Sequence, residues 1–504
     1  MKTDIFFHTT GEINHVSQTV DSILNQTTLP NRIYAFNEND SIDLSKDIVQ
    51  ISNSSSGFPG QFNIALAQSD ADMILYIDNR MAPVSLSNSI ISLLSISKAR
   101  IPNTGMFYSD YDNMDNSKIS EVRLLKHHQG RVRDNQDYGK VYLFDKKVLD
   151  SIGGMDESIQ FNHFYDLRLK ISEKSKLTHI ANRYSGSLYS IQTESKSSNV
   201  FDYLLAGKAQ QEEAESILSN HLDRMGSFLS PDSNLNQVPN EDAQLTATII
   251  IPVNDRPEFI GTAIDSILAQ TVQDIEVIVV VNGGKDDPTI PAVKNYLDGG
   301  SNYDSNAPKV RLLVTDINNI GYCLNLGAQN ANGKYYVQLD SDDRLKSDAV
   351  EKIVDLYKSD STIGMVIGSY EVWEKADDGS LSRMEEIPVV THDEWTDNNG
   401  RNNLLRINGA GAPRSIPIQV IKNIGFFEMN ETPFARNYGE DYDMVLRISE
   451  NYRIGRIYDP IYEVIRHSGG TDHAIDQIVI DRNDEAKDHM RLDAIQRRKT
   501  LNLK

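Results

Sequence analysis

The chain has 504 residues, 39% of them hydrophobic and 24% charged, with a formal net charge of −22 at pH 7. This composition is typical of a globular protein with a sizeable core, and the length suggests about three domains or two larger α/β units. The acidic balance argues against unaided binding to nucleic acid or an anionic membrane, because such binding depends on basic groups that neutralise phosphates. Cys323 is the single cysteine, which excludes an intramolecular disulfide and a multi-cysteine zinc site. No apolar run approaches about eighteen residues and the first residues do not resemble a signal peptide, so we expect a cytoplasmic protein.

The two halves of the chain repeat one another. Three pairs of segments match in the same order: 21–27 with 265–271, the apolar run before Asp78 with the run before Asp340, and 165–173 with 442–450. The offset grows from 244 (265 minus 21) to 262 (340 minus 78) and 277 (442 minus 165), which indicates loop insertions in the second copy. We therefore predict two homologous domains. The expected organisation is a first domain at 1–200, a helix and linker at 201–243, a second domain at 244–470 and a C-terminal helical extension at 471–504.

Strand and helix patterns alternate in the second copy. Buried strands are predicted at 246–253, 275–281, 310–314 and 335–339, and a helix is predicted at 257–270. This alternation predicts an α/β fold with a mostly parallel sheet, in which ligands bind beyond the carboxyl ends of the strands. The residues that follow three of these strands are polar: Asn254-Asp255, Asn282-Gly283-Gly284 and Asp340-Ser341-Asp342-Asp343. They indicate one crevice.

The acidic cluster that begins at Asp340 has two interpretations. Three carboxylates within four residues repel one another unless a cation or a helix N-terminus compensates them. They can cap a helix that begins near Ser347, or they can hold a divalent metal ion through oxygen ligands while substrate phosphates fill the remaining positions.

Several segments of the second copy resemble family 2 glycosyltransferases of the GT-A fold. The segments that carry the resemblance are Ile249–Asn254, Ser266–Thr271, Asn319–Gly321 before Asn325 and Gly333, Leu339–Asp343 and Gly439–Asp443. They cover most of 246–470 in the family's order. The resemblance implies a nucleotide-diphosphate sugar donor, a Mn²⁺ or Mg²⁺ ion at its diphosphate, and inversion at the anomeric carbon.

The resemblance also implies roles for individual residues. Asp340 and Asp342 fall at the metal position, and His467 falls where the family often places a histidine on the metal or diphosphate; a surface histidine remains the alternative, and His473 is a weaker candidate. Asp441 is the expected general base and Glu440 is expected to orient the acceptor, although an acidic pair at a helix N-terminus is also stabilised by the macrodipole. The expected donor-binding residues are Pro252, Val253, Asn254, Asp255, Asn282, Asn319, Asn325, Asp340, Ser341 and Arg414.

Two of these positions leave alternatives open. Arg414 could face the donor phosphates or the acceptor, or belong to an ordinary loop. Asn282 stands where the family commonly has an aspartate that reads the nucleobase; its amide can still bond a base edge. UDP is the first expectation for the nucleotide.

The first copy lacks the reactive residues. Asp78-Asn79-Arg80 stands where the second copy has Asp340-Ser341-Asp342, and His163-Phe164 stands where it has Glu440-Asp441. We expect a degenerate domain kept for packing, dimerisation or acceptor binding. A second active transferase, as in two-domain polymerases of polysaccharides, is the alternative.

Two further functions compete with this hypothesis. One is a non-catalytic protein that binds nucleotide sugars. The other is a nucleotidyltransferase, which is disfavoured because Asn254-Asp255-Arg256, rather than a glycine-rich basic loop, follows the first strand. The acceptor stays open among a glycan, a lipid-linked sugar, a protein and a modified nucleic acid base, and a homodimer is possible.

Overall fold

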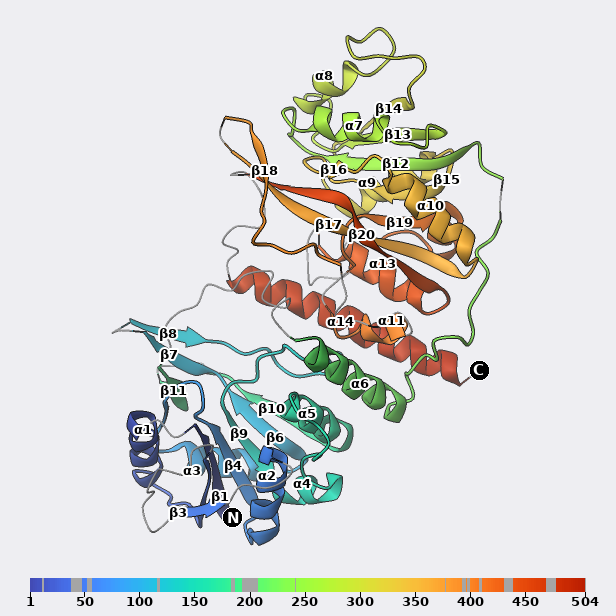
Figure 1. The fold of residues 1–504 in the computed structure, drawn as a ribbon. Coiled ribbons are helices and arrows are strands. Elements are labelled where there is room, and N and C mark those ends of the chain that lie inside the picture. Colours follow the sequence, from blue (N-terminus) through green and yellow to red (C-terminus); the bar gives the residue numbers. More distant parts are fainter. Residues whose placement is uncertain are drawn as a thin grey trace. The chain divides into compact units, whose positions relative to one another are not determined.

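The computed structural model describes residues 1–10, 13–37, 48–51, 57–115, 118–182, 186–192, 207–240, 242–376, 378–391, 396, 399–407, 410–429, 438–467 and 477–503. The chain divides into two compact units, Met1–Met225 and Gly226–Lys504 (Figure 1). No helix among the described residues is long and apolar enough to cross a membrane.

The first unit is built on a seven-stranded sheet of order β10-β6-β9-β4-β1-β2-β3 and a four-stranded sheet of order β5-β11-β7-β8. Its strands are β1 (Thr3–Thr9), β2 (Ile33–Asn37), β3 (Ile48–Ile51), β4 (Met73–Asp78), β5 (Val84–Leu86), β6 (Thr104–Ser109), β7 (Tyr111–Asp115), β8 (Lys118–Val122), β9 (Val141–Asp145), β10 (Lys176–Ile180) and β11 (Tyr189–Ile191). Its helices are α1 (Ile13–Leu24), α2 (Gly57–Gln68), α3 (Ile90–Arg100), α4 (Lys146–Ile152), α5 (His163–Lys174) and α6 (Lys208–Arg224). In the larger sheet, β9 runs antiparallel to its neighbours β4 and β6, and the other pairs are parallel.

The second unit is built on one nine-stranded sheet of order β14-β13-β12-β15-β19-β17-β20-β16, with β18 paired to β17. Its strands are β12 (Leu245–Val253), β13 (Ile275–Val281), β14 (Lys309–Val314), β15 (Gly333–Gln338), β16 (Arg344–Leu345), β17 (Ile363–Lys375), β18 (Leu381–Arg383), β19 (Arg414–Pro417) and β20 (Arg453–Arg466). Its helices are α7 (Ile260–Leu268), α8 (Thr289–Lys294), α9 (Ile320–Asn330), α10 (Ala349–Ser359), α11 (Gly400–Asn403), α12 (Ile418–Ile424), α13 (Glu440–Ser449) and α14 (Gln477–Asn502).

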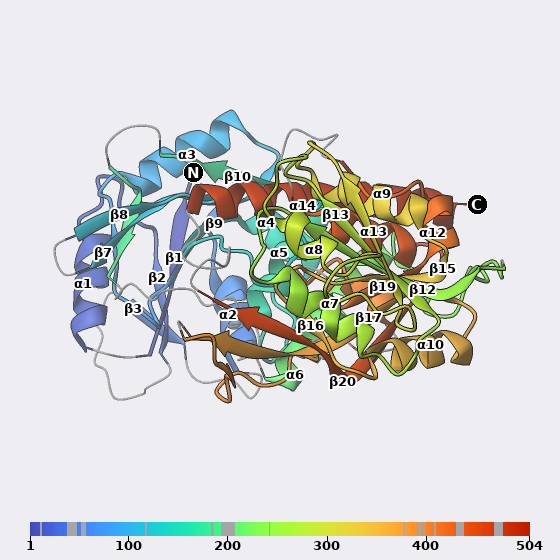
Figure 2. The ribbon, with the colours of Figure 1, turned by 90° about the horizontal axis from the view of Figure 1, so that it is seen from above.

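The fold class predicted from the sequence is confirmed. Strands β12, β13, β14 and β15 lie at the four predicted positions and pair in parallel, with β12 between β13 and β15. Nearly every residue of β12 and β13 is buried, as expected for strands covered on both faces. Helix α7 is shorter than the predicted 257–270, because Arg256 O accepts from the N–H groups of Phe259 and Ile260 and the chain turns before the helix begins. On the other part of the sheet, α10 packs along β17 and β20 (Figure 2).

The two units share their strand order and register. The strand order of the large sheet in the first unit, β3-β2-β1-β4-β9-β6-β10, matches the order of seven strands in the second unit, β14-β13-β12-β15-β19-β17-β20. Phe6 pairs with Tyr76 in the first unit, and Ile250 pairs with Gln338 in the second. These pairs are separated by the same offsets, 244 and 262, as the sequence repeats, so the register of the strands agrees with the predicted duplication.

The segment predicted as a linker is bound to the second unit. Asn402 donates to Leu229 O at 2.7 Å and accepts from Leu229 N at 2.9 Å. Arg401 Nη1 donates to the carbonyl oxygens of Ser230 and Ser233 at 2.7 and 2.9 Å. Both side chains are buried. The helix predicted before this segment is α6, which belongs to the first unit and contacts α5.

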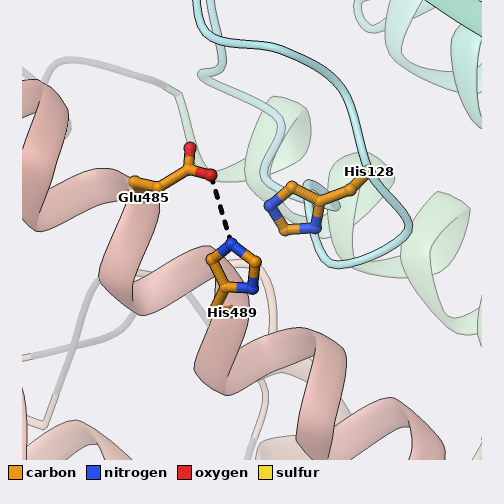
Figure 3. A group of neighbouring side chains, drawn as sticks. All are labelled: His128, Glu485 and His489. Carbon is orange, nitrogen blue, oxygen red and sulfur yellow. Dashed lines mark hydrogen bonds and ion pairs between the residues drawn. The ribbon is translucent and has the colours of Figure 1, made fainter. Parts of the chain in front are cut away.

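The predicted C-terminal helix is α14, which packs on α13 (Figure 1). It carries a fully buried ion pair: Arg491 Nη1 lies 2.7 Å from Asp488 Oδ1, and both side chains are 0% exposed. The Arg491 guanidinium also lies over the Tyr442 ring of α13, 4.9 Å from its centroid. On the same helix, His489 Nε2 lies 3.2 Å from Glu485 Oε1 (Figure 3). Helix α14 is therefore an integral part of the second unit and supports α13.

Replacing Asp488 should destabilise the second unit, because Asp488→Ala removes the carboxylate that accompanies Arg491 in the core. The expected loss is about 3–5 kcal/mol of unfolding free energy. Both tryptophans, Trp373 and Trp395, lie in the second unit, so tryptophan fluorescence during urea unfolding follows this unit. Asp493→Ala, at an exposed position of the same helix, is the matched control and should keep the wild-type midpoint. Equal midpoints for the two variants would contradict the buried pair's role.

Candidate active site of the second unit

Three loops meet beyond the carboxyl ends of β12, β13 and β15. The N–H of Asn282 donates to Val253 O at 2.9 Å, which joins the loops after β12 and β13. Asp287, a buried residue of the second loop, accepts from the N–H groups of Asp255 at 3.1 Å and Thr289 at 2.8 Å. Asp255 itself has a positive φ of 51° and an exposed side chain. These contacts fasten the loops after β12 and β13 to each other beyond the strand ends.

Within the described part of the chain, Asn282 leaves one polar atom of its side chain without a partner. Its side chain is buried, and its Nδ2 lies 3.4 Å from both Asn318 Oδ1 and Cys323 Sγ. Its Oδ1 has no hydrogen-bond partner among the described residues. A buried carbonyl oxygen without a partner is costly, so it is a ready acceptor for a donor group that enters the crevice.

The acidic cluster after β15 is organised by a tyrosine of β20. Tyr462 OH donates to Asp343 Oδ2 at 2.8 Å and accepts from the N–H of Asp340 at 3.1 Å. Asp343 Oδ1 accepts from Ile465 N at 2.8 Å, so both of its oxygens are engaged by protein groups. Burial, followed by the charges of Asp340 and Asp342, raises the pKa of Asp343 well above its usual range. Asp343 is therefore a structural member of the cluster.

Asp342 and His467 face each other. His467 Nε2 lies 3.2 Å from Asp342 Oδ2, and their side chains are 8% and 29% exposed respectively. The His467 ring packs on Phe259, with centroids 4.3 Å apart, and Lys375 Nζ lies 4.2 Å from the centroid of the Phe259 ring. The structure thus brings together two of the three predicted metal ligands. His473 lies outside the described residues.

Asp340, the third predicted ligand, faces different neighbours. Its Oδ1 accepts from Gln338 Nε2 at 3.3 Å, and among the described residues no hydrogen bond joins it to Asp342 or His467. Burial raises the pKa of Asp340, the charge of Asp342 raises it further, and Arg414 opposes the shift. Two carboxyl groups that disfavour each other's charge fit a site in which a cation is bound.

Arg414 forms an ion pair with the predicted base. Its Nη2 lies 2.7 Å from Asp441 Oδ2, and its Nε donates to Ala410 O at 2.7 Å. Burial opposes the charge of Arg414, but Asp441, Asp340 and Glu440 together raise its pKa above the usual range. Burial, followed by the charge of Asp441, raises the pKa of Glu440 to about 8. Glu440 and Asp441 begin α13, where the helix macrodipole favours negative charge.

The remaining predicted donor residues divide into two groups. Pro252 and Val253 are buried in β12, whereas Asn254 and Ser341 are partly exposed at the crevice. Asn319 caps α9 by accepting from Tyr322 N at 2.8 Å.

Asn325 fastens a loop. Its side chain donates to Phe427 O at 2.9 Å and accepts from Phe427 N at 2.8 Å. These contacts assign Asn319 and Asn325 to the frame of the site, and donor contact by either residue stays a prediction.

Sequence reasoning missed three residues that organise the site: Tyr462, Phe259 and Asp287. Each acts through contacts with residues far along the chain, and each stands in an unremarkable sequence context. The sequence also indicated Arg414 but not its ion pair with Asp441. The two residues belong to β19 and α13, and nothing in the sequence between them shows that these elements lie side by side.

The corresponding crevice of the first unit differs in chemistry. Arg80 donates to both oxygens of Asp78, from Nε at 2.9 Å and from Nη2 at 3.0 Å. This bidentate pair uses the carboxylate that corresponds to Asp340. The strand register and the helix offset place Tyr142 at the position of Arg414 and Phe164 at the position of Asp441.

Aromatic rings fill the space around these positions in the first unit. Phe58 stacks on His8 with centroids 4.0 Å apart, and Phe164 packs on Tyr76 at 4.6 Å and on Tyr142 at 5.6 Å. A nucleotide diphosphate needs polar and cationic partners, which this packing does not offer. The predicted loss of the reactive groups is thus accompanied by an apolar filling.

In the second unit, carboxyl groups and an arginine converge beyond the ends of parallel strands, where ligands bind in open α/β sheets. Residues 248–408 match the family described as Glycosyl transferase family 2. The second unit therefore contains a family 2 glycosyltransferase domain, as the sequence resemblance predicts.

Curated relatives match part of the chain. A Rickettsia bellii (strain RML369-C) protein described as an uncharacterized glycosyltransferase is 32% identical over 213 residues, which are 42% of this chain and 28% of that protein. The hyaluronan synthase of Pasteurella multocida is 36% identical over 135 residues, 27% of this chain and 12% of the synthase. The chain thus spans less than a third of the length of these two relatives.

Solved structures show a distant likeness. Staphylococcus aureus TarS 1–349 in complex with UDP-GlcNAc has 16% identity and a TM-score of 0.35, covering 46% of this chain and 62% of that one. The mannosyltransferase PcManGT from Pyrobaculum calidifontis, in complex with GDP-Man and Mn²⁺, has 14% identity and a TM-score of 0.35, covering 58% of this chain and 83% of that one. The family assignment depends on the sequence match.

The raised pKa of Glu440 predicts how stability changes with pH. In the fold its pKa is about 8, above the ordinary value of 4.5, so the protonated form is favoured by folding. The stability that this preference contributes is fully present below about pH 4.5 and is lost as pH rises through 8. Glu440→Gln removes the charge, so its Tm relative to wild type should rise between pH 5 and pH 9. Glu386→Gln, at an exposed position, is the control; a Tm difference for Glu440→Gln that does not change with pH would contradict the assignment.

Proposed function

We propose that the second unit is an inverting, metal-dependent glycosyltransferase that moves a sugar from a nucleotide-diphosphate donor to a hydroxyl acceptor. The observation that carries the proposal is the meeting of two pairs, Asp342 with His467 and Arg414 with Asp441, in a domain that matches family 2. Asp342 and His467 are suited to binding a metal ion and its phosphate ligand. Arg414 and Asp441 are suited to proton transfer.

The metal would be held by Asp342, His467 and Asp340. The first two offer an oxygen and a nitrogen already facing each other at 3.2 Å. Burial, followed by the charge of Asp342, raises the pKa of Asp340, and a bound cation would offset both effects. When bound, Mn²⁺ or Mg²⁺ neutralises the charge that develops on the leaving diphosphate.

Asn282 would read the nucleobase. Its unpartnered Oδ1 accepts one hydrogen bond, and its Nδ2, held only by long contacts, donates another. An acceptor beside a donor matches the N–H and C=O edge of a uracil, which supports UDP as the first donor nucleotide to test.

Asp441 would accept the proton of the acceptor hydroxyl. It is held by Arg414, so its carboxylate is oriented before the acceptor arrives. Glu440, with a pKa of about 8, is largely protonated at pH 7 and can donate a hydrogen bond to an acceptor oxygen. The two adjacent carboxyl groups thus differ in protonation, as their proposed roles require.

A dual-active polymerase is less well supported than a single active unit. Arg80 occupies the carboxylate of Asp78, and rings fill the place of Asp441 in the first unit. A non-catalytic binding protein would have no need for the Asp441 and Glu440 pair. The acceptor class, including a modified nucleic acid base, is decided by product analysis.

The role of Asp441 is tested by Asp441→Asn, which keeps the size of the side chain and removes its basicity. General base catalysis contributes about 10²–10⁴-fold, so transfer should fall by that factor. Binding of UDP in the presence of Mn²⁺, measured by calorimetry, should persist. Asp443→Asn, two residues further along α13 and paired with Arg447, is the control and should retain most activity. Near-wild-type transfer by Asp441→Asn would contradict the proposal.

A further inference from the structure

The first unit contains a cavity of about 320 Å³ beside its aromatic filling. Phe164 and Tyr142 form one wall, with ring centroids 5.6 Å apart and planes at 45°. The loop 134–140 forms another wall. A volume near 300 Å³ is at the small end of the range for small-molecule sites and suits a ligand of one or two rings.

The position of this cavity corresponds to the reactive part of the second unit. Tyr142 and Phe164, the two rings of its wall, occupy the positions of Arg414 and Asp441. At that place the first unit has two aromatic rings and a cavity, where the second unit has an ion pair. Both rings are partly exposed, so part of their surface is available to a ligand.

The wall formed by the loop 134–140 is largely polar and is held in place by hydrogen bonds. Asp137 Oδ1 accepts from Gly139 N at 2.7 Å, and Tyr142 OH donates to Gly139 O at 2.6 Å. Tyr189 OH accepts from Lys140 N at 2.9 Å. Gly139 has a φ of +85°, and a Cβ there would lie 2.1 Å from Tyr189 OH, so the loop requires glycine at this position. A loop fixed in this way loses little entropy when a ligand binds.

The polar groups of the cavity include both donors and acceptors. Among the described residues, the side-chain amide of Asn135 and the ammonium of Lys140 have no hydrogen-bond partner, and Asn135 is exposed. Charges balance along the lining, with Asp134 and Asp137 against Lys140 and Arg168. A balanced lining favours neither a phosphate nor a cation and suits an uncharged ligand with many hydroxyl groups.

We propose that this cavity of the first unit is a binding site for an uncharged sugar. A pyranose has C–H groups on its faces and hydroxyl groups around its edge. The C–H face would pack on Phe164 and Tyr142, because aromatic faces carry negative charge density that attracts such hydrogens. The hydroxyl edge would bond to Asn135, Asp137 and Lys140. This site needs no metal and no nucleotide, and it is independent of transfer by the second unit.

Sugar binding to the full chain is measured by saturation-transfer-difference NMR. The ligands are the methyl glycosides of glucose, galactose, mannose and N-acetylglucosamine, and the buffer contains EDTA and no nucleotide. At least one glycoside should bind the wild type. Phe164→Leu, which keeps apolar volume and removes the flat face, should weaken that binding about five- to tenfold. Phe161→Leu, at an exposed position outside the cavity lining, is the matched control and should bind as the wild type does.

Asn135→Ala is the second variant, because it removes an exposed polar group and leaves the core untouched. It should weaken binding about two- to fivefold and leave Tm unchanged. Absence of binding by every glycoside, or binding that both variants retain in full, would overturn the proposal. So would UDP binding in EDTA that depends on Phe164, since the cavity would then be a nucleotide site. Because metal and nucleotide are absent, none of these outcomes bears on the function proposed for the second unit.

Discussion

The structure of the candidate site in the second unit depends on how the protein compensates several carboxyl groups that lie close together. Asp340, Asp343 and Glu440 lie at the ends of a parallel sheet and a helix, where burial and neighbouring negative charges raise their pKa values. Asp441 lies beside Glu440 at the start of α13. Arg414 brings one positive charge among them and binds Asp441 directly. Protein hydrogen bonds satisfy Asp343, a raised pKa keeps Glu440 largely protonated at neutral pH, and Asp342 faces His467. What remains at the crevice is a cluster with excess negative charge, which is the property that a divalent cation recognises.

The first unit shows the same frame under a different constraint. Its strand order and register match those of the second, so the parallel sheet itself does not require the acidic cluster. Arg80 forms an ion pair with Asp78. Tyr142 and Phe164 stand where the second unit has the Arg414–Asp441 ion pair. Without the charged side chains of Arg414 and Asp441, the corresponding space in the first unit is occupied by aromatic rings. The same strand order thus accommodates a cluster of carboxyl groups in the second unit and a cluster of aromatic rings in the first.

Much of the fold could be predicted from the sequence because its strands are uniform. The run Ile275–Val281 is apolar at almost every position, and β13 has those same bounds. The long strands β17 and β20 mix polar and apolar residues and contain register shifts, so no simple period marks them. The antiparallel placement of β19 between β15 and β17 is likewise a tertiary feature, since its four residues carry no directional signal.

The candidate site was predicted where chemistry is local and missed where it is long-range. Acidic residues that are adjacent or nearly adjacent in the sequence are easy to recognise as candidates, as with Asp340 and Asp342 or Glu440 and Asp441. Tyr462 lies 122 positions from Asp340, and its hydroxyl connects two of these carboxyl residues only after the sheet has formed. The family resemblance predicts a donor contact for Asn325, whereas in the structure its side-chain amide donates to Phe427 O and accepts from Phe427 N.

The central claim is that the nucleotide-sugar chemistry belongs to the second unit alone. The most direct measurement compares Asp340→Asn with Asp78→Asn, the corresponding position of the first unit, in Mn²⁺-dependent UDP binding and in transfer from a panel of nucleotide sugars. If only the second unit binds the donor, Asp340→Asn loses most Mn²⁺-dependent UDP binding and transfer, whereas Asp78→Asn keeps both. Equal losses in the two variants, or loss of one of two distinct transfer products in Asp78→Asn, would contradict this claim.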